Sequence, residues 1–209
     1  MYINLTHVLK SDITVYPGTI PPKFEPGNTI EKDGFAELNI TMCTHTGTHI
    51  DAPAHIIEGA PTLDSYPMDK FIGKGFVIDC RNLHSIERDF LQGWEQEIRR
   101  SDFLLFYSGW QDKWNTESYF EPFPVLTQEA AEWLTGFHLK ALGFDVISVD
   151  KMDDHHLPNH HILLPKEILI IENMANLHFL LDKAFELYVI PLYIGKADGS
   201  PVRAFARLL

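Results

Sequence analysis

The chain has 209 residues, of which 45% are hydrophobic and 22% charged, and its formal net charge at pH 7 is −12. This length and composition predict one globular domain, residues 1–209, with a sizeable buried core. An acidic chain without clusters of Lys and Arg is not expected to bind nucleic acid, because phosphate contacts require such clusters. Two cysteines are too few for a disulfide framework. The chain does not start with basic residues followed by a long apolar run, so we expect no signal peptide. No stretch is apolar over the roughly 20 residues that span a bilayer, so we expect a cytoplasmic protein with no membrane partner.

Short apolar runs bounded by turn residues predict β-strands along most of the chain. In chain order, the predicted strands are 35–44, 75–80, 103–107, 141–149, 168–171, 187–194 and 202–208. Two segments predict helices, 85–100 with Ser85 as its cap and 127–139 with Thr127 as its cap. The segments 15–34 and 108–126 predict long loops, which are often binding segments. Because helices separate only some of the strands, we expect a mixed α/β fold.

Seven of the eleven histidines fall in two short windows, and the first window is CTHTGTHIDAPAH. It carries His45, His49, Asp51 and His55, spaced H-x-x-x-H-x-D-x-x-x-H. As extended backbone, the segment would place His45, Gly47, His49 and Asp51 on one face, because side chains alternate with period two. Pro53 would then turn the chain and bring His55 back over that face. A helix would also put the first two histidines together, but the glycine, threonines and isoleucine disfavour it.

Imidazole nitrogen and carboxylate oxygen are the ligands that zinc and related divalent metals take. Three such ligands with an open position are typical of a catalytic site, and the absence of a Cys-x-x-Cys pair excludes a zinc finger. The alternative is that these side chains satisfy backbone groups in a tight turn. Four of them at this spacing favour a metal or proton-transfer site.

The second window, residues 151–173, carries four histidines and ends near Glu172. Glu172 directly follows the apolar run 168–171, so it is expected where a buried strand emerges. Burying its charge is unfavourable unless a cation accompanies it. The alternative is a glutamate exposed to solvent at the strand end.

The stretch HTGTHIDAPAH resembles the H-x-G-T-H-x-D-x-P-x-H signature of the metal-dependent cyclase family, which includes bacterial kynurenine formamidase, an arylformamidase of tryptophan catabolism, and isatin hydrolase. The likeness continues in order through LTHVL, ITVYPG, YSGWQDKW, YFEPFPVLTQEAAEWL, LGFDVISVD and HHILLPKEILIIENMANL. It implies a single-domain α/β fold of the swivelling β/β/α type, with a mixed sheet and few helices. It also implies a homodimer or a larger oligomer such as a tetramer.

By this resemblance, His45, His49 and Asp51 would bind one divalent metal, and Asp51 and Glu172 would bridge to a second that His160 completes. His55 would be the general acid/base. Zinc is the favoured metal, one or two ions per chain, with manganese as the alternative. His161 directly follows His160, so the assignment could slip by one residue, but the spacing to Glu172 favours His160.

The expected reaction is metal-dependent hydrolysis of an amide or formamide bond in a small molecule, with water activated at the metal. An arylformamidase such as kynurenine formamidase is the first hypothesis. The alternatives are hydrolysis of a cyclic amide or isatin-type lactam, and a non-catalytic metal-binding protein. Formamidases typically have tryptophan where this chain has Tyr16, which counts against N-formylkynurenine as the substrate. A binding protein would have no use for the proton-transfer residue His55. The predicted pocket walls are Tyr16, Phe35 and Trp110, with ordinary core packing as the alternative for the last two. Ser148 and Asp150 are predicted to hold a ligand histidine.

Overall fold

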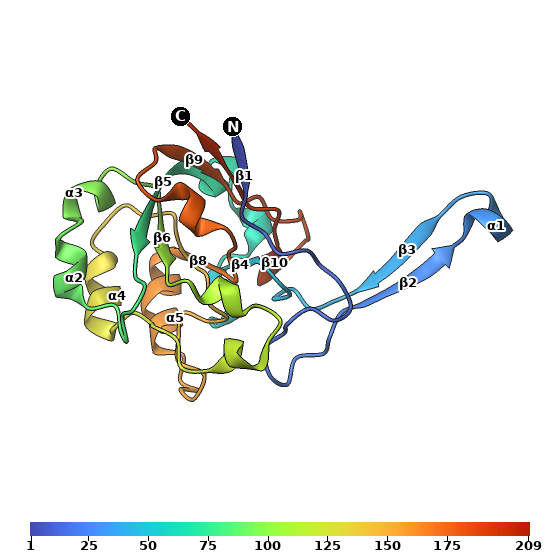
Figure 1. Cartoon of the computed structure of the whole chain (residues 1–209), viewed down its shortest axis with the longest axis horizontal. Helices are drawn as coiled ribbons and strands as arrows, with labels where there is room; N and C mark the ends of the chain where they lie inside the picture. Colours follow the sequence, from blue (N-terminus) through green and yellow to red (C-terminus); the bar gives the residue numbers. More distant parts are fainter.

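The computed structural model describes residues 1–209, and most of its strands join one mixed sheet of nine strands (Figure 1). The strand order is β1-β11-β9-β5-β6-β7-β8-β4-β10. The four strands from β5 to β8 run parallel, and every other neighbouring pair is antiparallel. The bounds are β1 Tyr2–Asn4, β4 His49–Asp51, β5 Ile72–Asp79, β6 Phe103–Tyr107, β7 Ala141–Phe144, β8 Leu169–Glu172, β9 Phe185–Tyr188, β10 Gly199–Pro201 and β11 Phe205–Leu208. The predicted α/β fold with a mixed sheet and few helices is confirmed.

Both faces of the sheet centre are buried, which explains why the central strand β6 reads as an unbroken apolar run. Leu104 and Phe106 point into the core formed with the helices, and the alternate residues Phe103 and Leu105 point into a second core on the other face. The helices gather beside β5 and β6 on one face (Figure 1). They are α2 Arg88–Gln92, α3 Glu95–Ile98, α4 Gln128–Leu134 and α5 Pro158–Leu163. None of the helices is both long and apolar enough to cross a lipid bilayer.

The helix predictions hold in place but not in their bounds. The predicted cap Ser85 is wrong, since α2 begins at Arg88 with Glu87 as its N-cap residue. The segment 85–100 forms two short helices rather than one, because the chain leaves helical geometry at Trp94, directly after Gly93. Glycine weakens a helix, and the Trp94 ring packs on Phe76 of β5 at 5.6 Å between centroids. Thr127 caps α4 as predicted, accepting a hydrogen bond from the Ala130 amide. The predicted end at residue 139 is wrong, since α4 ends at Leu134.

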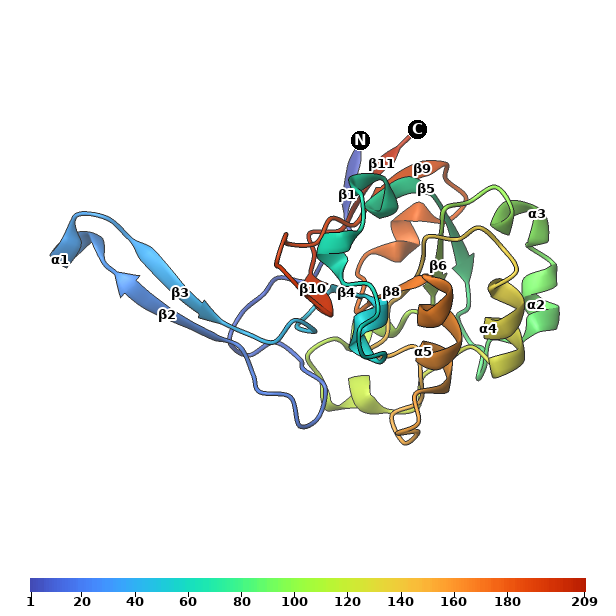
Figure 2. The ribbon, with the colours of Figure 1, turned by 180° about the vertical axis from the view of Figure 1, so that it is seen from behind.

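A two-stranded arm projects from the body of the protein (Figures 1 and 2). It consists of β2 Lys23–Asn28, α1 Ile30–Asp33 and β3 Glu37–Thr41, where the sequence predicted a loop followed by a strand. Phe24 pairs with Ile40 and Pro26 with Leu38, so these apolar side chains share one face of the arm. Leu38 and Ile40 are 53% and 52% exposed.

Candidate metal centre

The short strand β4 organises the candidate metal centre. Its residues His49 and Asp51 point to one face, while Ile50 between them is fully buried in the core on the other. The neighbouring strand β8 is antiparallel to β4, with His49 directly opposite Glu172 at the end of β8. The helix α5, which sequence reasoning missed, carries His160 to the same place. Three elements far apart in sequence therefore deliver their polar side chains to one point.

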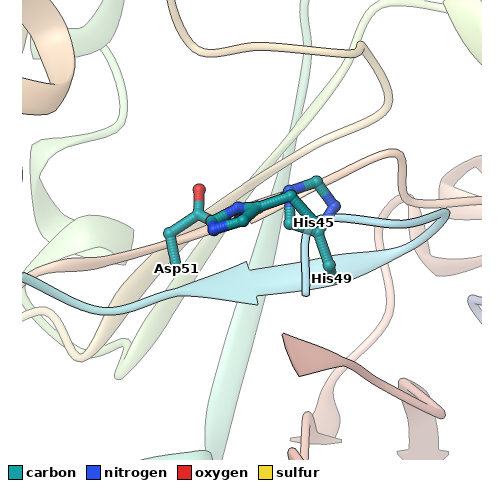
Figure 3. Close-up of side chains that lie close together, drawn as sticks. All are labelled: His45, His49 and Asp51. Carbon is teal, nitrogen blue, oxygen red and sulfur yellow. Dashed lines mark ion pairs between the residues drawn. The ribbon is translucent and has the colours of Figure 1, made fainter. Parts of the chain in front are cut away.

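The segment before β4 is a turn, not the extended strand that the sequence predicted. Gly47 adopts φ +66°, a conformation that favours glycine. A Cβ there would lie 2.8 Å from Leu9 Cδ2, so the protein's own side chains fill the space beside Gly47. The turn folds His45 back beside His49 and Asp51 (Figure 3), and its Nδ1 lies 2.8 Å from Asp51 Oδ1.

The Asp51 carboxylate lies at the centre of two groups of donor atoms. Its Oδ1 is 3.4 Å from His49 Nε2, and its Oδ2 is 3.9 Å from His160 Nε2. Glu172 faces the same two nitrogens, with Oε2 3.5 Å from His49 Nε2 and Oε1 3.7 Å from His160 Nε2. His45, His49 and Asp51 form one group, and Asp51, His160 and Glu172 form the other.

These residues fit a divalent cation. Asp51 is 1% exposed, and neither of its carboxylate oxygens accepts a hydrogen bond of good geometry, although His45 Nδ1 lies close to one of them. In the metal-free protein the imidazole of His45 offsets the charge of this buried carboxylate, and a bound cation would take over that role. Ligands at about 2.0–2.2 Å from a common ion stand roughly 3.0–3.5 Å apart, which is the spacing of His49 from Asp51 and from Glu172. The nitrogen and oxygen donors suit zinc or manganese.

The second ring nitrogen of each ligand histidine has its own acceptor. His49 Nδ1 lies 2.8 Å from the Gly47 carbonyl, and His160 Nδ1 lies 2.7 Å from Asp150 Oδ2, so the predicted role of Asp150 agrees with the geometry. His45 Nε2 lies 3.0 Å from a carboxylate oxygen of Asp198. With the proton on these nitrogens, the lone pairs of His45 Nδ1, His49 Nε2 and His160 Nε2 face Asp51 and Glu172.

Electrostatics also indicate missing positive charge. Burial, reinforced by Asp51, raises the pKa of Glu172 to about 8. Burial lowers the pKa of His49 to about 4 against the opposing effect of Asp51. Burial would lower the pKa of His45 as well, but Asp51 and Asp198 raise it to about 10. The metal-free protein therefore keeps a proton on Glu172 at neutral pH, where a cation would favour the ionised carboxylate.

His55 lies next to the metal ligands. Pro53 begins the short 3-10 helix Pro53–His55, which places the His55 ring 4.0 Å from the His45 ring and 5.7 Å from the His160 ring, between centroids. Burial lowers the pKa of His55, which favours the neutral imidazole at pH 7. A cavity of about 560 Å³ is lined by His55 together with His45, His49, His160 and Glu172, a volume suited to a small molecule.

One wall of the cavity comes from the loop 14–20, including Tyr16 as predicted. Phe35 does not reach the cavity, because it lies between α1 and β3 on the arm and is 54% exposed. Trp110 does not reach it either: its indole donates a hydrogen bond to the Tyr119 carbonyl, and it lines a different hollow. Both expectations fail because local hydrophobicity does not reveal which cavity a residue faces. His155, from the second histidine window, also lines the cavity.

The two adjacent histidines on α5 are clearly distinguished. His160 is 3% exposed and faces Asp51 and Glu172, whereas His161 is exposed. Ser148 lines the cavity and accepts a hydrogen bond from the Asp150 amide. Sequence reasoning missed Asp198, since no spacing in the chain connects it with the histidines. Its only signal is the Asp-Gly pair at the start of β10, where Asp198 directly precedes the strand.

Comparison with known proteins gives a consistent result. The family model described as "Putative cyclase" matches residues 3–151. The chain is 34% identical over 208 residues to kynurenine formamidase from Bacillus cereus, covering 99% of this chain and 97% of the relative. It is 33% identical over 210 residues to kynurenine formamidase from Bacillus cytotoxicus, covering 100% and 98%. The structure of isatin hydrolase A from Labrenzia aggregata superposes with a TM-score of 0.88 at 26% identity, covering 99% of this chain and 93% of that one.

Proposed function

The chain belongs to the Cyclase family, and we propose that it is a metal-dependent hydrolase of the arylformamidase type, cleaving a non-peptide C–N bond in a small molecule. The observation that carries this proposal is the buried Asp51 carboxylate, whose histidine and glutamate neighbours line one cavity together with His55. The kynurenine formamidases and isatin hydrolase A to which the chain is similar are amidohydrolases, which supports this reaction class. We also propose that residues 1–209 form a single hydrolase domain.

We assign the metal ligands by their donor atoms. His45 Nδ1, His49 Nε2 and Asp51 would hold one cation, and Asp51, His160 Nε2 and Glu172 would hold a second. When bound, a divalent cation supplies Lewis-acid chemistry, lowering the pKa of water to about 7 and polarising a carbonyl oxygen. Zinc is our proposed metal, with manganese as the alternative, because both accept imidazole and carboxylate ligands.

His55 performs the proton transfers in this proposal. Its Nδ1 faces Asp198 at 3.6 Å, which leaves Nε2 for the cavity. The neutral imidazole accepts a proton from the attacking water as the new C–O bond forms. It then returns that proton to the leaving nitrogen as the C–N bond breaks, so that formate and a free amine result from a formamide. One side chain therefore serves as base and then as acid.

The decisive test is hydrolysis of N-formylkynurenine by protein of known metal content. We expect no turnover after removal of metal with a chelator, and recovery when zinc or manganese is returned. His49→Ala should lose both metal and turnover, while the matched control His161→Ala should keep both, since His161 is exposed and faces away from the other ligands. Metal-independent turnover would contradict the proposal.

A lactam such as isatin is the second candidate substrate. Tyr16 in the cavity wall and the similarity to isatin hydrolase A favour it. Assaying isatin beside N-formylkynurenine, with the same metallated protein, discriminates between the two substrates. Failure of both with metal fully bound would favour a non-catalytic metal-binding protein.

We also propose that the protein is a cytoplasmic homodimer joined through the arm. Both cysteines are free thiols, as expected in a reducing compartment. A hairpin of two strands is barely stable alone in water, and this one exposes an apolar face that carries Leu38 and Ile40. A second exposed apolar patch, residues 192–194, lies beside β10 on the body and offers a complement on the same chain. Each arm would cover that patch on the other copy.

The arm proposal predicts a change in molecular mass. Replacing Leu38 and Ile40 together by serine should convert the dimer to a monomer in size-exclusion chromatography with light scattering, because the apolar contact is lost. Asn39→Ser lies on the opposite face of β3 and is the matched control, expected to remain dimeric. A monomeric wild-type protein would refute this role of the arm.

A further inference from the structure

The Asp198 carboxylate contacts both a predicted metal ligand and the predicted proton-transfer residue. Its Oδ2 lies 3.0 Å from His45 Nε2 and 3.6 Å from His55 Nδ1. Its other oxygen, Oδ1, accepts a hydrogen bond from the Thr44 hydroxyl at 3.0 Å. A single carboxylate oxygen therefore faces both histidine rings, and the second oxygen fixes its orientation.

The backbone around Asp198 is held firmly against β4. The Asp198 carbonyl accepts a hydrogen bond from the Ala52 amide, and Gly199 is paired with Asp51 across the β4–β10 ladder. A Cβ on Gly199 would lie 2.6 Å from Cε1 of His45, so the imidazole ring rests directly on the backbone at this point. The Gly199 backbone therefore packs against the His45 ring, and the Asp198 carboxylate contacts its Nε2.

We propose that Asp198 is a positioning residue that links the metal ligand His45 to the acid/base His55 through one shared carboxylate. The proposal rests on the function proposed above. His45 donates its Nε2 hydrogen to Asp198 and therefore binds metal through Nδ1, which is the nitrogen facing Asp51. His55 is directed by the same oxygen, so that its Nε2 points to the substrate. Asp198 does not line the cavity, so we assign it a role that acts through the two histidines.

The donor atoms of Asp198 also offer a second role, that of a metal ligand. His45, His55 and Asp198 are close enough together to form a ligand group of their own. The geometry favours the positioning role, because all three side chains are only partly buried. The group of Asp51, His160 and Glu172 is buried throughout, and neither Asp51 oxygen in it accepts a hydrogen bond. The zinc stoichiometry of a variant distinguishes the two roles.

The test uses the zinc-loaded protein with Asp198→Asn, Asp198→Ala and a control, Asp182→Asn. Asp182 is exposed, so Asp182→Asn removes the same charge without changing the site. Because carboxylates that orient ligand histidines typically contribute 10–100-fold to metal affinity, we expect both Asp198 variants to bind zinc at least 10-fold more weakly in competition with a chromophoric chelator. At saturating zinc, kcat for N-formylkynurenine should still be reduced 10-fold or more, with KM little changed.

A spectroscopic readout tests the same point without turnover. Nitrogen-15 NMR of the histidine rings in the zinc-loaded wild type should show the His45 proton on Nε2, and Asp198→Asn should alter that signal. Unchanged zinc affinity in both variants would overturn the proposal, as would full kcat at saturating zinc. Loss of a whole equivalent of zinc would make Asp198 a ligand instead and overturn it too. If the wild type hydrolyses no formamide, the proposed function fails, while zinc affinity and the ring signal still report on Asp198.

Discussion

The replacement Glu172→Gln should stabilise the metal-free protein, although it removes a predicted metal ligand. Glu172 is 5% exposed, and burial together with Asp51 raises its pKa to about 8, against an ordinary value of 4.5. Between these two pH values the folded protein holds a proton that the unfolded chain has released. The folded state therefore loses stability relative to the unfolded state as the pH rises through this window.

The magnitude follows from the width of that window. Each pH unit changes the free energy of unfolding by about 1.4 kcal/mol for one proton, so the interval from pH 5 to 8 corresponds to roughly 4 kcal/mol as an upper bound. Glutamine keeps the hydrogen bond that Glu172 Oε1 accepts from the Val149 amide, at 3.0 Å, but has no charge to bury. The stability advantage of Glu172→Gln should therefore be small near pH 5 and greatest near pH 8.

The assay is urea unfolding in the presence of a chelator at pH 5, 6, 7 and 8, for wild type and Glu172→Gln. Glu132→Gln, at an exposed position on α4, is the control and should follow the wild type at every pH. Excess zinc should stabilise the wild type most at high pH, because a bound cation favours the ionised carboxylate. If the free energy of unfolding changes with pH by the same amount in wild type and Glu172→Gln, the ionisation of Glu172 does not affect stability, and the reasoning is refuted.

Three further substitutions test the site and its support. His55→Ala should keep its zinc but lose about 10²–10⁴-fold in kcat, because it removes only the proton-transfer group; retained turnover would exclude His55 from the mechanism. His160→Ala should lower the zinc content measured by atomic absorption, whereas His161→Ala should not, and the reverse result would place the ligand one residue along. Gly75→Ala should destabilise the protein by about 1–3 kcal/mol in urea unfolding, since a Cβ would overlap the Phe185 ring, and an unchanged midpoint would contradict that packing.

Strands with an unbroken apolar sequence could be predicted well because their pattern is local. The predicted strand 103–107 coincides with β6, where every residue is buried. The segment 141–149 was predicted as one strand, but β7 ends at Phe144 because the chain turns there toward the site, where Asp150 meets His160. Sequence periodicity does not report such a change of direction, because the residues after the strand are equally buried.

The metal-ligand motif was visible for a similar reason, since its donors lie within a few residues of one another. The geometry of the motif could not be predicted, because a pattern of alternating residues gives no sign of the left-handed conformation of Gly47. His45 reaches Asp51 only because of this turn. An extended strand would place the two residues on the same face but roughly 20 Å apart, at about 3.3 Å per residue. Asp198 could not be found from spacing, because only the pairing of β10 with β4 brings it to His45.

The three residues of β4 show how little chain is needed to assemble such a site. Ile50 is fully buried in the core, and this fixes which face His49 and Asp51 occupy, since a slip of one residue would exchange the two faces. One edge of β4 pairs with β8 and sets Glu172 opposite His49, while the other edge pairs with β10 and sets Gly199 opposite Asp51. The register of a single strand therefore places the second carboxylate on one side and the backbone that supports His45 on the other. The chemistry at this point depends on the core residue between the two ligands as much as on the ligands themselves.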